Sequence, residues 1–509
     1  MFPSRRHLRA RDGTSRGRPR ASLWWAGVCL AALVSCGESP SRPVAPPGRI
    51  PLTIGLSSAH TDVGPLVRIL TNQVLVGTGP DGRPTPGLLQ SWTPAADGMS
   101  WVFTLVPDVR RHDGRVVTAD DVAGVIREQI DRDPLPGLLD VDRLEVVNPG
   151  TLRVHLRQPS SLLLEALTLT RAVPAGPFLP GDVSLGSTSA PTLPASSNSA
   201  TAPTAIDRVM FRRYESPRAA WSALMRDEID LLHEVSGEAR PFLEQADGIE
   251  VRPFLRPFVV TLGLNVRHPA LRQRDVRLAL NHAVDRADLL TRDFGGRGLA
   301  AATQVWPRHW AADASMQPHI FDRELARRLL DGAGFRPVNR ADGRPSRLRL
   351  TCLIMDDVPR LERVALRVRR AYADVGIDLV IEAVPSLEFA TRLGAGDYET
   401  FLVTVMSGHG LNAVFAMWGR HDLARDFDHG YTAAQEAAEA VRRAHSDEAL
   451  RDALPALQRV LFDDPPAVFL VWEEMARAVG RRFVVPPTPG RDILGTLPQW
   501  SPRTGGNEP

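Results

Sequence analysis

Residues 348–384 read LRLTCLIMDDVPRLERVALRVRRAYADVGIDLVIEAV, a run in which two short apolar segments flank a longer one. The first segment, 348–354, and the last, 378–384, have the length and composition of β-strands, whereas 359–373 predicts a helix. Strands joined through a helix pair in parallel, because a parallel pair needs a long crossover connection. This run therefore predicts a lobe of the α/β class. Cys352 lies inside the first strand, and we expect it to pack in the core.

Shorter patterns on either side of this run predict further strands and helices. Residues 101–105 alternate as a half-buried strand does, between a turn at Asp97-Gly98 and another at 112–114. Thr118 is expected to be the N-cap of the next helix, and Asp121 adds a negative charge to its first turn. We also expect strands at 52–57 and 206–214, a hairpin at 142–156 with its tip at 148–150, helices at 66–76, 218–226 and 322–334, and one helical face at 276–284.

Residues 184–205 differ in composition from the rest of the chain. Ser, Thr, Ala and Pro dominate there, and charged or large apolar side chains are nearly absent. Such a segment cannot bury enough apolar surface to order itself. We therefore predict a disordered loop over 184–205.

The N-terminus has the layout of a bacterial lipoprotein export signal. Seven arginines and one acid precede an apolar run of about a dozen residues that ends in Leu33-Val34-Ser35-Cys36. This run is shorter than the roughly 20 residues that a membrane-spanning helix needs. We predict a signal peptide over 1–35, a lipid on Cys36 and a flexible linker over 36–50, which together hold the protein on the extracytoplasmic face of the cell membrane. The alternatives are an uncleaved anchor and a chance cysteine.

The composition excludes several classes of protein. All 61 basic residues are arginine, and removal of residues 1–35 leaves 54 arginines against 58 acids, a net charge of about −4. This charge gives no reason to expect nucleic-acid binding. Of the three cysteines, Cys29 lies in the signal and Cys36 at the lipid site. Cys352 is therefore left without a disulfide partner, and no thiolate metal cluster can form.

Four motifs carry a resemblance to a known family. The first runs from Ser91-Trp92 through Asp97-Gly98, Trp101-Val102-Phe103-Thr104-Leu105 and His112-Asp113-Gly114 to Thr118-Ala119-Asp120-Asp121-Val122. The others are Leu264-Asn265 with 275–286 (DVRLALNHAVDR), 321–335 with its end Ala333-Gly334-Phe335, and 372–379 (YADVGIDL). In this order they resemble the extracytoplasmic solute-binding proteins of peptide-type ABC importers, family 5. The motifs are caps, turns and core faces, so they indicate the fold and leave the ligand open.

The resemblance implies an α/β fold of two lobes, the class II-like periplasmic-binding-protein or Venus-flytrap fold, with a small extra α+β domain. The implied segments are 51–77, 171–262 and 476–509 for lobe one, 78–170 for the extra domain and 263–475 for lobe two. The solute would lie between the lobes and favour their closure, and the permease subunits of an ABC importer would recognise the closed form. No cofactor or metal is implied, and we expect a monomer.

Three segments depart from the family pattern. Residues 175–178 keep only the Gly-Pro-aromatic part of a longer turn, and the loop 184–205 stands where the family has further strands. Peptide-binding members commonly hold the ligand's amino group with an Asp late in lobe two, but 404–413 (TVMSGHGLNA) contains no acid. A buried ammonium without a counter-charge is costly. This difference disfavours ordinary peptides and favours an uncharged or different solute.

Clefts of this kind combine aromatic walls with a few polar groups. Five residues are candidate ligand contacts on this basis: His60, Trp306, His409, Asn412 and Trp418. His60 follows the first strand, and strand ends face the cleft in α/β lobes, although a solvated loop histidine is the alternative. Trp306 lies in a region that reaches the cleft in the family, with packing as its alternative. Trp418 lies where the family often has a ligand-stacking aromatic.

Other aromatic residues have a structural interpretation. Trp92 and Trp101 are expected in the core of the extra domain, and His282 beside an apolar helix face. Trp310 is a further aromatic residue considered for the cleft.

The sequence contains no catalytic motif. It has no G-x-S-x-G elbow, no H-E-x-x-H, no phosphate-binding loop and no calcium loop. The acid pairs at 120–121, 356–357 and 463–464 fit helix caps better than acid–base catalysis. We therefore predict a solute receptor without enzymatic activity that delivers its solute to an ABC importer. The alternative is a sensory or interaction lipoprotein that kept the clamp and lost import; a lipid-anchored hydrolase has little support.

Overall fold

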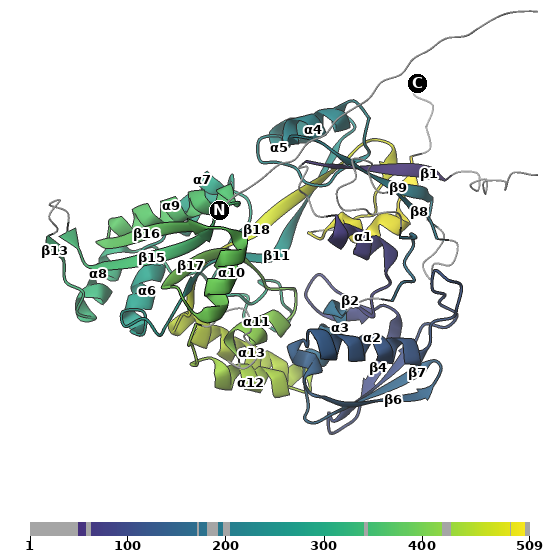
Figure 1. The fold of residues 1–509 in the computed structure, drawn as a ribbon, viewed down its shortest axis with the longest axis horizontal. Helices are drawn as coiled ribbons and strands as arrows, with labels where there is room; N and C mark the ends of the chain where they lie inside the picture. The colour runs from purple at the N-terminus through teal and green to yellow at the C-terminus, as the bar shows by residue number, and fades with distance from the viewer. Residues whose placement is uncertain are drawn as a thin grey trace, which may run out of the picture. The chain divides into compact units, whose positions relative to one another are not determined.

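The computed structural model describes residues 49–57, 63–170, 173–180, 192–196, 204–339, 345–419, 429–488 and 490–503, whose arrangement is drawn in Figure 1. The predicted signal peptide, Cys36, nearly all of the linker 36–50 and His60 lie outside these residues. The described residues fall within one unit, 47–509. Within them, no helix combines the length and the apolar character that crossing a membrane requires.

A mixed sheet of ten strands organises the described residues. Its order is β16-β15-β17-β11-β18-β10-β1-β9-β8, and β12 pairs with β18. The strands are Ile377–Val384 (β16), Leu348–Met355 (β15), Thr400–Met406 (β17), Glu250–Leu264 (β11), Ala467–Val479 (β18), Leu231–Leu232 (β10), Ile50–Leu56 (β1), Ile206–Arg213 (β9), Thr192–Pro194 (β8) and Leu299–Ala300 (β12). The two longest, β11 and β18, connect the strands on the two sides of the sheet (Figure 1).

We call β15, β16 and β17, with the helices packed on them, lobe two. β15 and β16 pair in parallel over their whole length, and α9 (Pro359–Ala373) joins them, which confirms the predicted β-α-β unit. Cys352 is fully buried in the core of this lobe, where burial raises the pKa of its thiol to about 12. The predicted helical face is also confirmed, because α6 (Arg274–His282) buries Val276, Ala279 and Leu280 in the same core.

We call β1, β8, β9 and β10, with their helices, lobe one. β1 pairs in parallel with β9 and β10, whereas β8 pairs antiparallel with β9. Since β8 lies inside 184–205, the prediction of a disordered loop is wrong for Thr192–Pro194. Leu193 is fully buried in the core of lobe one and supplies an apolar anchor that the average composition conceals. Residues 184–191 and 197–203 lie outside the described residues.

A four-stranded antiparallel sheet, in the order β4-β5-β7-β6, forms the small domain together with α2 and α3. Thr118 is the N-cap of α2, as predicted, and it also forms a capping box with Asp121. Trp92 and Trp101 are half-buried against the core of this domain. The bounds here are Leu89–Pro94 (β4), Ser100–Leu105 (β5), Val141–Asn148 (β6), Thr151–Leu156 (β7), Ala119–Arg132 (α2) and Leu162–Leu169 (α3), with a 3-10 turn, Pro136–Leu138 (η1).

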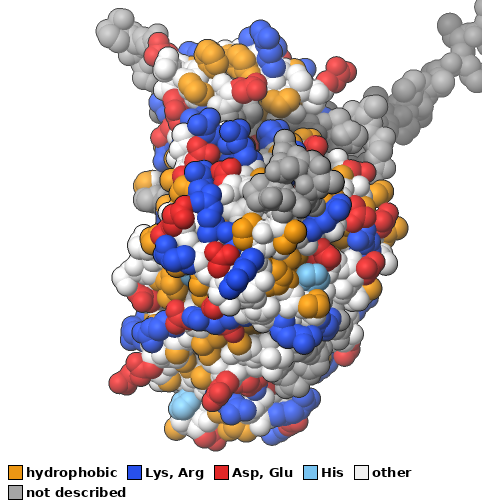
Figure 2. Space-filling view, turned by 90° about the vertical axis from the view of Figure 1, so that its left-hand side faces the viewer, with side chains coloured by type: hydrophobic (Ala, Val, Ile, Leu, Met, Phe, Trp, Pro, Cys, Tyr) orange, Lys and Arg blue, Asp and Glu red, His pale blue; other side chains and the backbone are white. Residues whose placement is uncertain are grey.

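The remaining elements cover or connect these sheets. They are α1 (Gly64–Thr71), β2 (Val76–Thr78), β3 (Pro84–Pro86), α4 (Pro217–Met225), α5 (Arg240–Glu244), α7 (Arg286–Asp293), α8 (Arg323–Gly332), β13 (Val338–Asn339), β14 (Pro345–Ser346), α10 (Ser386–Ala395), α11 (Asn412–Trp418), α12 (Gln435–Arg443), α13 (Asp447–Asp463), β19 (Phe483–Val484), η2 (Ile493–Gln499) and β20 (Ser501–Pro502). Figure 2 shows basic and acidic side chains interspersed over the face seen there, in keeping with the near balance of charges in the chain.

Candidate solute-binding site

The parallel strands of the two lobes end facing each other. β15 and β17 run in the same direction as β18, so their carboxyl ends, at Met355 and Met406, point toward lobe one. β1 and β10 run against β18, so their carboxyl ends, at Leu56 and Leu232, point toward lobe two. Ligands of open α/β sheets bind outside the carboxyl ends of the strands. The carboxyl-end edge of lobe two and the carboxyl-end edge of lobe one therefore face each other across the middle of β11 and β18.

We define the crossing region as residues 255–259 of β11 and 472–474 of β18. The pairing of β11 with β18 shifts register within it, so three residues of β11 leave the regular ladder. There the carbonyl oxygen of Pro257 accepts hydrogen bonds from the N–H groups of Ser407 and Gly408, at 2.9 and 3.2 Å. An irregularity of this kind bends a strand and re-aims its side chains, and it commonly lies beside a functional site.

A buried carboxylate lies at the centre of the crossing region. Glu473 is 1% exposed, and Arg256 donates from Nη1 to its Oε2 at 3.2 Å. Arg360, in the first turn of α9, places Nη2 2.9 Å from Oε1 of the same carboxylate, as an ion pair without hydrogen-bond alignment. Burial lowers the pKa of Arg256, and the charge of Glu473 opposes this shift. One carboxylate thus orients two guanidinium groups that belong to different elements.

Aromatic rings form a wall beside this cluster. Trp306 contacts His409 and Trp472 edge to face, with ring centroids 4.7 and 5.4 Å apart. Burial, and after it the charge of Arg491, lowers the pKa of His409 to about 4, so its imidazole is neutral at pH 7. The indole N–H of Trp306 is buried and has no hydrogen-bond partner among the described residues. The wall is therefore apolar but carries an available donor.

Lobe one adds a histidine and an arginine at its own strand edge. His233 follows β10, and burial, and after it the charge of Arg477, lowers its pKa to about 3. Arg477 donates to both carboxylate oxygens of Asp492, at 3.0 and 2.6 Å. Among the described residues, no three His, Cys, Asp or Glu side chains are arranged to hold a metal ion.

The five candidate contacts from the sequence fall in different environments. Trp306 and His409 contact each other at the crossing region. Trp418 is 2% exposed and donates from Nε1 to Gln304 Oε1 at 2.6 Å, inside lobe two. Asn412 is also 2% exposed, and it faces the small domain. His60 lies outside the described residues.

Sequence reasoning missed three residues of the crossing region: Arg256, Arg360 and Glu473. Arg360 follows the predicted strand 348–354 closely, so the strand-end rule that selected His60 also applies to it. Glu473 stands in the apolar run AVFLVWEEM, where a buried acid is unusual and signals a partner. No local signal marks Arg256, because its partner is 217 residues away in the chain.

The small domain contacts lobe two along a polar interface, which we call the seam: 137–165 against 411–412 and 441–442. Asn412 accepts a hydrogen bond from Gly137 N–H at 2.9 Å and donates to the Leu162 carbonyl at 3.1 Å. Arg442 donates from Nη1 to both carboxylate oxygens of Asp140 at 2.7 Å, and the two side chains are 5% and 7% exposed. These seam side chains find their partners within the protein.

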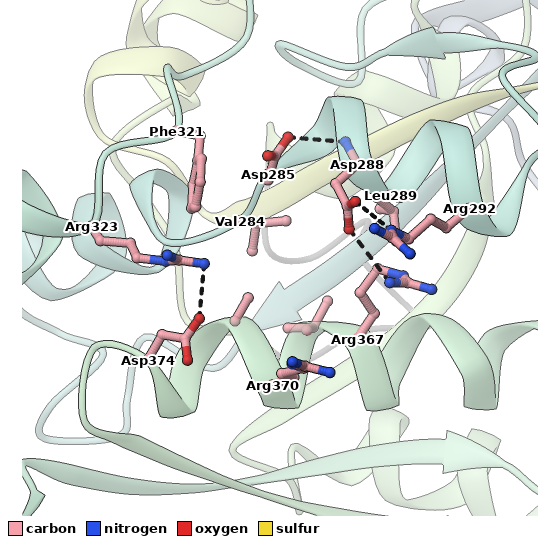
Figure 3. Close-up of a pocket in the computed structure, with 12 residues that line it drawn as sticks. Val284, Asp285, Asp288, Leu289, Arg292, Phe321, Arg323, Arg367, Arg370 and Asp374 are labelled. Carbon is pink, nitrogen blue, oxygen red and sulfur yellow. Dashed lines mark hydrogen bonds and ion pairs between the residues drawn. The ribbon is translucent and has the colours of Figure 1, made fainter.

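Three pockets among the described residues lie outside the crossing region, and two of them are lined by residues discussed in this section. One, of about 220 Å³, follows the seam and is lined in part by Trp92, Trp101 and Trp310. The other, of about 410 Å³, lies between α7 and the end of α9 (Figure 3). Its Arg323 pairs with Asp374 at 2.9 Å, and its other acids pair in the same way with neighbouring arginines or cap α7. This pocket is therefore a surface network of paired charges.

Comparison with known proteins identifies one family. The model of the bacterial extracellular solute-binding proteins, family 5 Middle, matches residues 83–419. The nickel-binding periplasmic protein of Escherichia coli K12 is 23% identical over 389 residues, which are 68% of this chain and 74% of that protein. The glutathione-binding protein GsiB of the same strain is 22% identical over 446 residues, 80% and 82% of the two chains.

Solved structures share the fold. NikZ from Campylobacter jejuni, in complex with Ni(L-His), has a TM-score of 0.74 at 18% identity over 89% of this chain and 99% of that one. The oligopeptide-binding protein AppA from Bacillus subtilis, in complex with a nonapeptide, has a TM-score of 0.73 at 15% identity over the same shares. These are two-lobed periplasmic binding proteins, so this chain has the two-lobed α/β fold with a small additional domain. Since the family model matches more than half of the chain, the chain belongs to the bacterial extracellular solute-binding proteins of family 5.

Proposed function

We propose that the chain is the lipid-anchored, extracytoplasmic solute receptor of an ABC importer, which binds a peptide or other small solute between its lobes and delivers it to the permease. The observation that carries this proposal is the meeting of two strand edges at the crossing region, with charged and aromatic side chains from both sides of the sheet. Family membership supports the receptor role. The basic and apolar layout that ends at Cys36 supports the anchor and the location.

The proposed mechanism is a shift of population toward a closed clamp. A solute at the crossing region contacts lobe two through Trp306, His409 and Arg360, and contacts lobe one where β1 and β10 end. Both sets of contacts form together only when the lobes close, so the solute stabilises the closed state. Asn412 and Trp418 do not contact the solute in this mechanism. Asn412 holds the small domain in place, and Trp418 supports the aromatic wall of lobe two.

A binding screen tests the receptor role. Short peptides, sugars, metal chelates and amines are each added to the purified protein while its melting temperature is measured. A solute at 100 times its Kd stabilises the folded state by about 2.7 kcal/mol, which is a readily measured shift. Small-angle X-ray scattering with the same solute should report a smaller radius of gyration as the lobes close.

A matched pair of variants locates the binding. Trp306→Ala should weaken binding of the hit at least tenfold, whereas Trp221→Ala should not, because Trp221 stacks on Phe242 in lobe one. Equal affinity in both variants would contradict the proposed location.

Anchoring and delivery need separate tests. Cys36→Ser should move the protein from the membrane fraction to the soluble fraction, and mass spectrometry of the N-terminal peptide should show the lipid only in the parent chain. Deletion of the gene should lower uptake of the solute found in the screen. Binding and closure without any effect on uptake would favour the sensory lipoprotein instead.

A further inference from the structure

We infer that the chain has a second small-molecule site, which binds a neutral pyranose ring beside the seam. The site is the pocket of about 220 Å³ that includes Trp92, Trp101 and Trp310, and we call it the side pocket. It shares no lining residue with the crossing region, so it goes beyond the proposed function and does not depend on it. Its size, its free aromatic face, its charges and its polar atoms lead to this class of ligand.

Two structural units build the walls of the side pocket. Trp92 and Trp101 come from β4 and β5 of the small domain, whereas Ala444 and Leu450 belong to the core around α12 and α13, against which Trp310 packs. These two helices lie beside the small domain in Figure 1. The volume is below the roughly 300–1,000 Å³ of pockets for drug-sized ligands, so the side pocket fits a single ring. A ring bound there would contact both units and strengthen the seam.

Trp92 supplies an aromatic face for stacking. It pairs with Phe103 across the β4–β5 ladder, and Trp101 lies two residues from Phe103, so the three rings are on one side of the sheet. Trp101 stacks on Phe103, with ring centroids 6.3 Å apart. Trp92 is half-buried, and within the described part of the chain its ring has neither an aromatic nor an arginine partner. The flat C–H face of a pyranose can pack on such an indole ring.

The charges at the side pocket are already paired within the protein. Arg83, which lines the pocket, pairs with Asp447 at 2.9 Å and lies 3.6 Å from Asp81, and Arg451 lies 3.9 Å from Asp447. Both guanidinium groups lie over the ring of Trp310, with Cζ 3.8 and 5.2 Å from its centroid. An anion would compete with two carboxylates for these arginines, and a cation would find its place over Trp310 taken. A neutral ligand therefore fits better than a charged one.

The polar atoms of the side pocket match the hydroxyl rim of a sugar. The indole N–H of Trp101 is buried and has no hydrogen-bond partner among the described residues. Glu165 is 6% exposed, also lines the pocket, and accepts from the Leu411 N–H group through one oxygen, Oε2. Its other oxygen, Oε1, lies 3.5 Å from Nε2 of His309, without hydrogen-bond alignment. A hydroxyl is both donor and acceptor, so it can satisfy Trp101 and Glu165 where a hydrocarbon ring cannot.

Matched sugars test the class of ligand. The methyl β-pyranosides of glucose, galactose and mannose are compared with analogues of the same sugars that carry an amine or a carboxylate, and with indole. Saturation-transfer difference NMR and titration calorimetry on the purified protein at pH 7 measure binding. At least one neutral pyranoside should bind at least tenfold more tightly than its charged analogues and than indole. Its affinity should change less than twofold as sodium chloride is raised from 50 to 500 mM.

Two results of this comparison would overturn the inference and leave the receptor role intact. One is binding of the charged analogues or of indole as tightly as the pyranoside. The other is absence of binding by all three pyranosides.

Variants place the sugar at the side pocket. Trp92→Ala removes the stacking face and should lower the affinity for the pyranoside at least tenfold. Trp101→Phe keeps a ring but removes the N–H group, and it should lower the affinity at least threefold. Trp221→Ala is the matched control, because Trp221 stacks on Phe242 in lobe one, and it should leave the affinity unchanged. Unchanged affinity in both Trp92→Ala and Trp101→Phe would overturn the inference.

A further variant separates the side pocket from the crossing region. Trp306→Ala removes part of the aromatic wall of the crossing region and should leave the affinity for the pyranoside within twofold of the parent value. Loss of pyranoside binding in Trp306→Ala but not in Trp92→Ala would place the sugar between the lobes, which would overturn the inference and support the receptor role. Circular dichroism confirms that each variant is folded, and Trp101→Phe, the milder change, still tests the site if Trp92→Ala does not fold.

Discussion

The seam and the crossing region are both polar interfaces inside the same molecule, and they differ in how their arginines are paired. At the seam, Asn412 uses both ends of its amide, and Arg442 is matched to Asp140. At the crossing region, two arginines share one carboxylate and buried donors are left over. A buried arginine that pairs with two carboxylates, as Arg442 does with Asp140 and Glu439, holds a structure together, whereas two arginines that share one carboxylate keep donors for another partner. The seam is therefore structural, and the crossing region is where a solute is expected.

The largest effect should come from breaking the charge pair of the seam. Arg442→Ala leaves the buried carboxylate of Asp140 without its counter-charge, with only the amide of Gln158 donating to it at 2.8 Å. We expect this variant to lower the free energy of unfolding by about 3–5 kcal/mol. The neighbouring Arg443 is 65% exposed and lies 3.6 Å from Glu439, so Arg443→Ala is the matched control and should cost less than about 1 kcal/mol. Urea unfolding of both variants measures the difference. Similar costs would mean that the seam does not differ from an ordinary surface.

A second prediction tests whether Asn412 stabilises the seam or binds the solute. Asn412→Ala removes the acceptor of Gly137 N–H and the hydrogen bond to the Leu162 carbonyl, and it should lower the free energy of unfolding by about 1–3 kcal/mol. Affinity for a solute should change less than threefold. Asn148→Ala, at the exposed tip of the β6–β7 hairpin, is the control and should cost about 1 kcal/mol or less. A large loss of affinity with little loss of stability would move Asn412 from the seam to the binding site.

Lowering the pH should destabilise the folded protein through His409, which lies at the crossing region. Its pKa in the folded state is about 4, and its ordinary value is 6.5. Between these two values, the unfolded chain binds a proton that the folded chain does not, so the free energy of unfolding falls as pH falls. The slope for one such group is at most about 1.4 kcal/mol per pH unit.

His409→Gln should make this acid slope shallower, by up to about 1 kcal/mol per pH unit between pH 6 and pH 4.5. Urea unfolding at a series of pH values measures it, and His445→Gln, an exposed histidine next to α13, controls for the loss of one imidazole. An unchanged slope would show that His409 is more hydrated than its burial indicates.

The smallest effect should be found at the pocket of Figure 3. Arg323 and Asp374 are 49% and 42% exposed, and they pair at 2.9 Å. Arg323→Ala should change the free energy of unfolding by less than about 1 kcal/mol, since exposed pairs are screened by water and salt. Solute binding should be unaffected. A larger effect on either quantity would give this pocket a role that its paired charges do not suggest.

Much of the fold follows from local sequence patterns. The β-α-β unit, the N-cap at Thr118 and the buried face of α6 each depend on residues close together in the chain, and each is confirmed. The prediction of a disordered loop over 184–205 was wrong at β8, because the average composition hides one apolar residue, Leu193, that packs in the core of lobe one.

The binding site was less predictable because its contacts are distant in the sequence. The family resemblance directed attention to residues 404–413, which contain no acid. The buried acid lies instead at Glu473, where two arginines share it. Asn412 illustrates the reverse case. Its position suggested a solute contact, but its partners come from residues 137 and 162, and only the tertiary structure brings them together.

The continuous ladder of β11 and β18 has a mechanical consequence. The two lobes share one hydrogen-bonded ribbon rather than a loose linker, so closing them means bending that ribbon. The ladder is irregular at 255–259, and we expect bending to concentrate there. If the lobes close as proposed, part of the energy of solute contact would be stored in the bent ribbon. That stored strain would help to reopen the clamp once the solute has left.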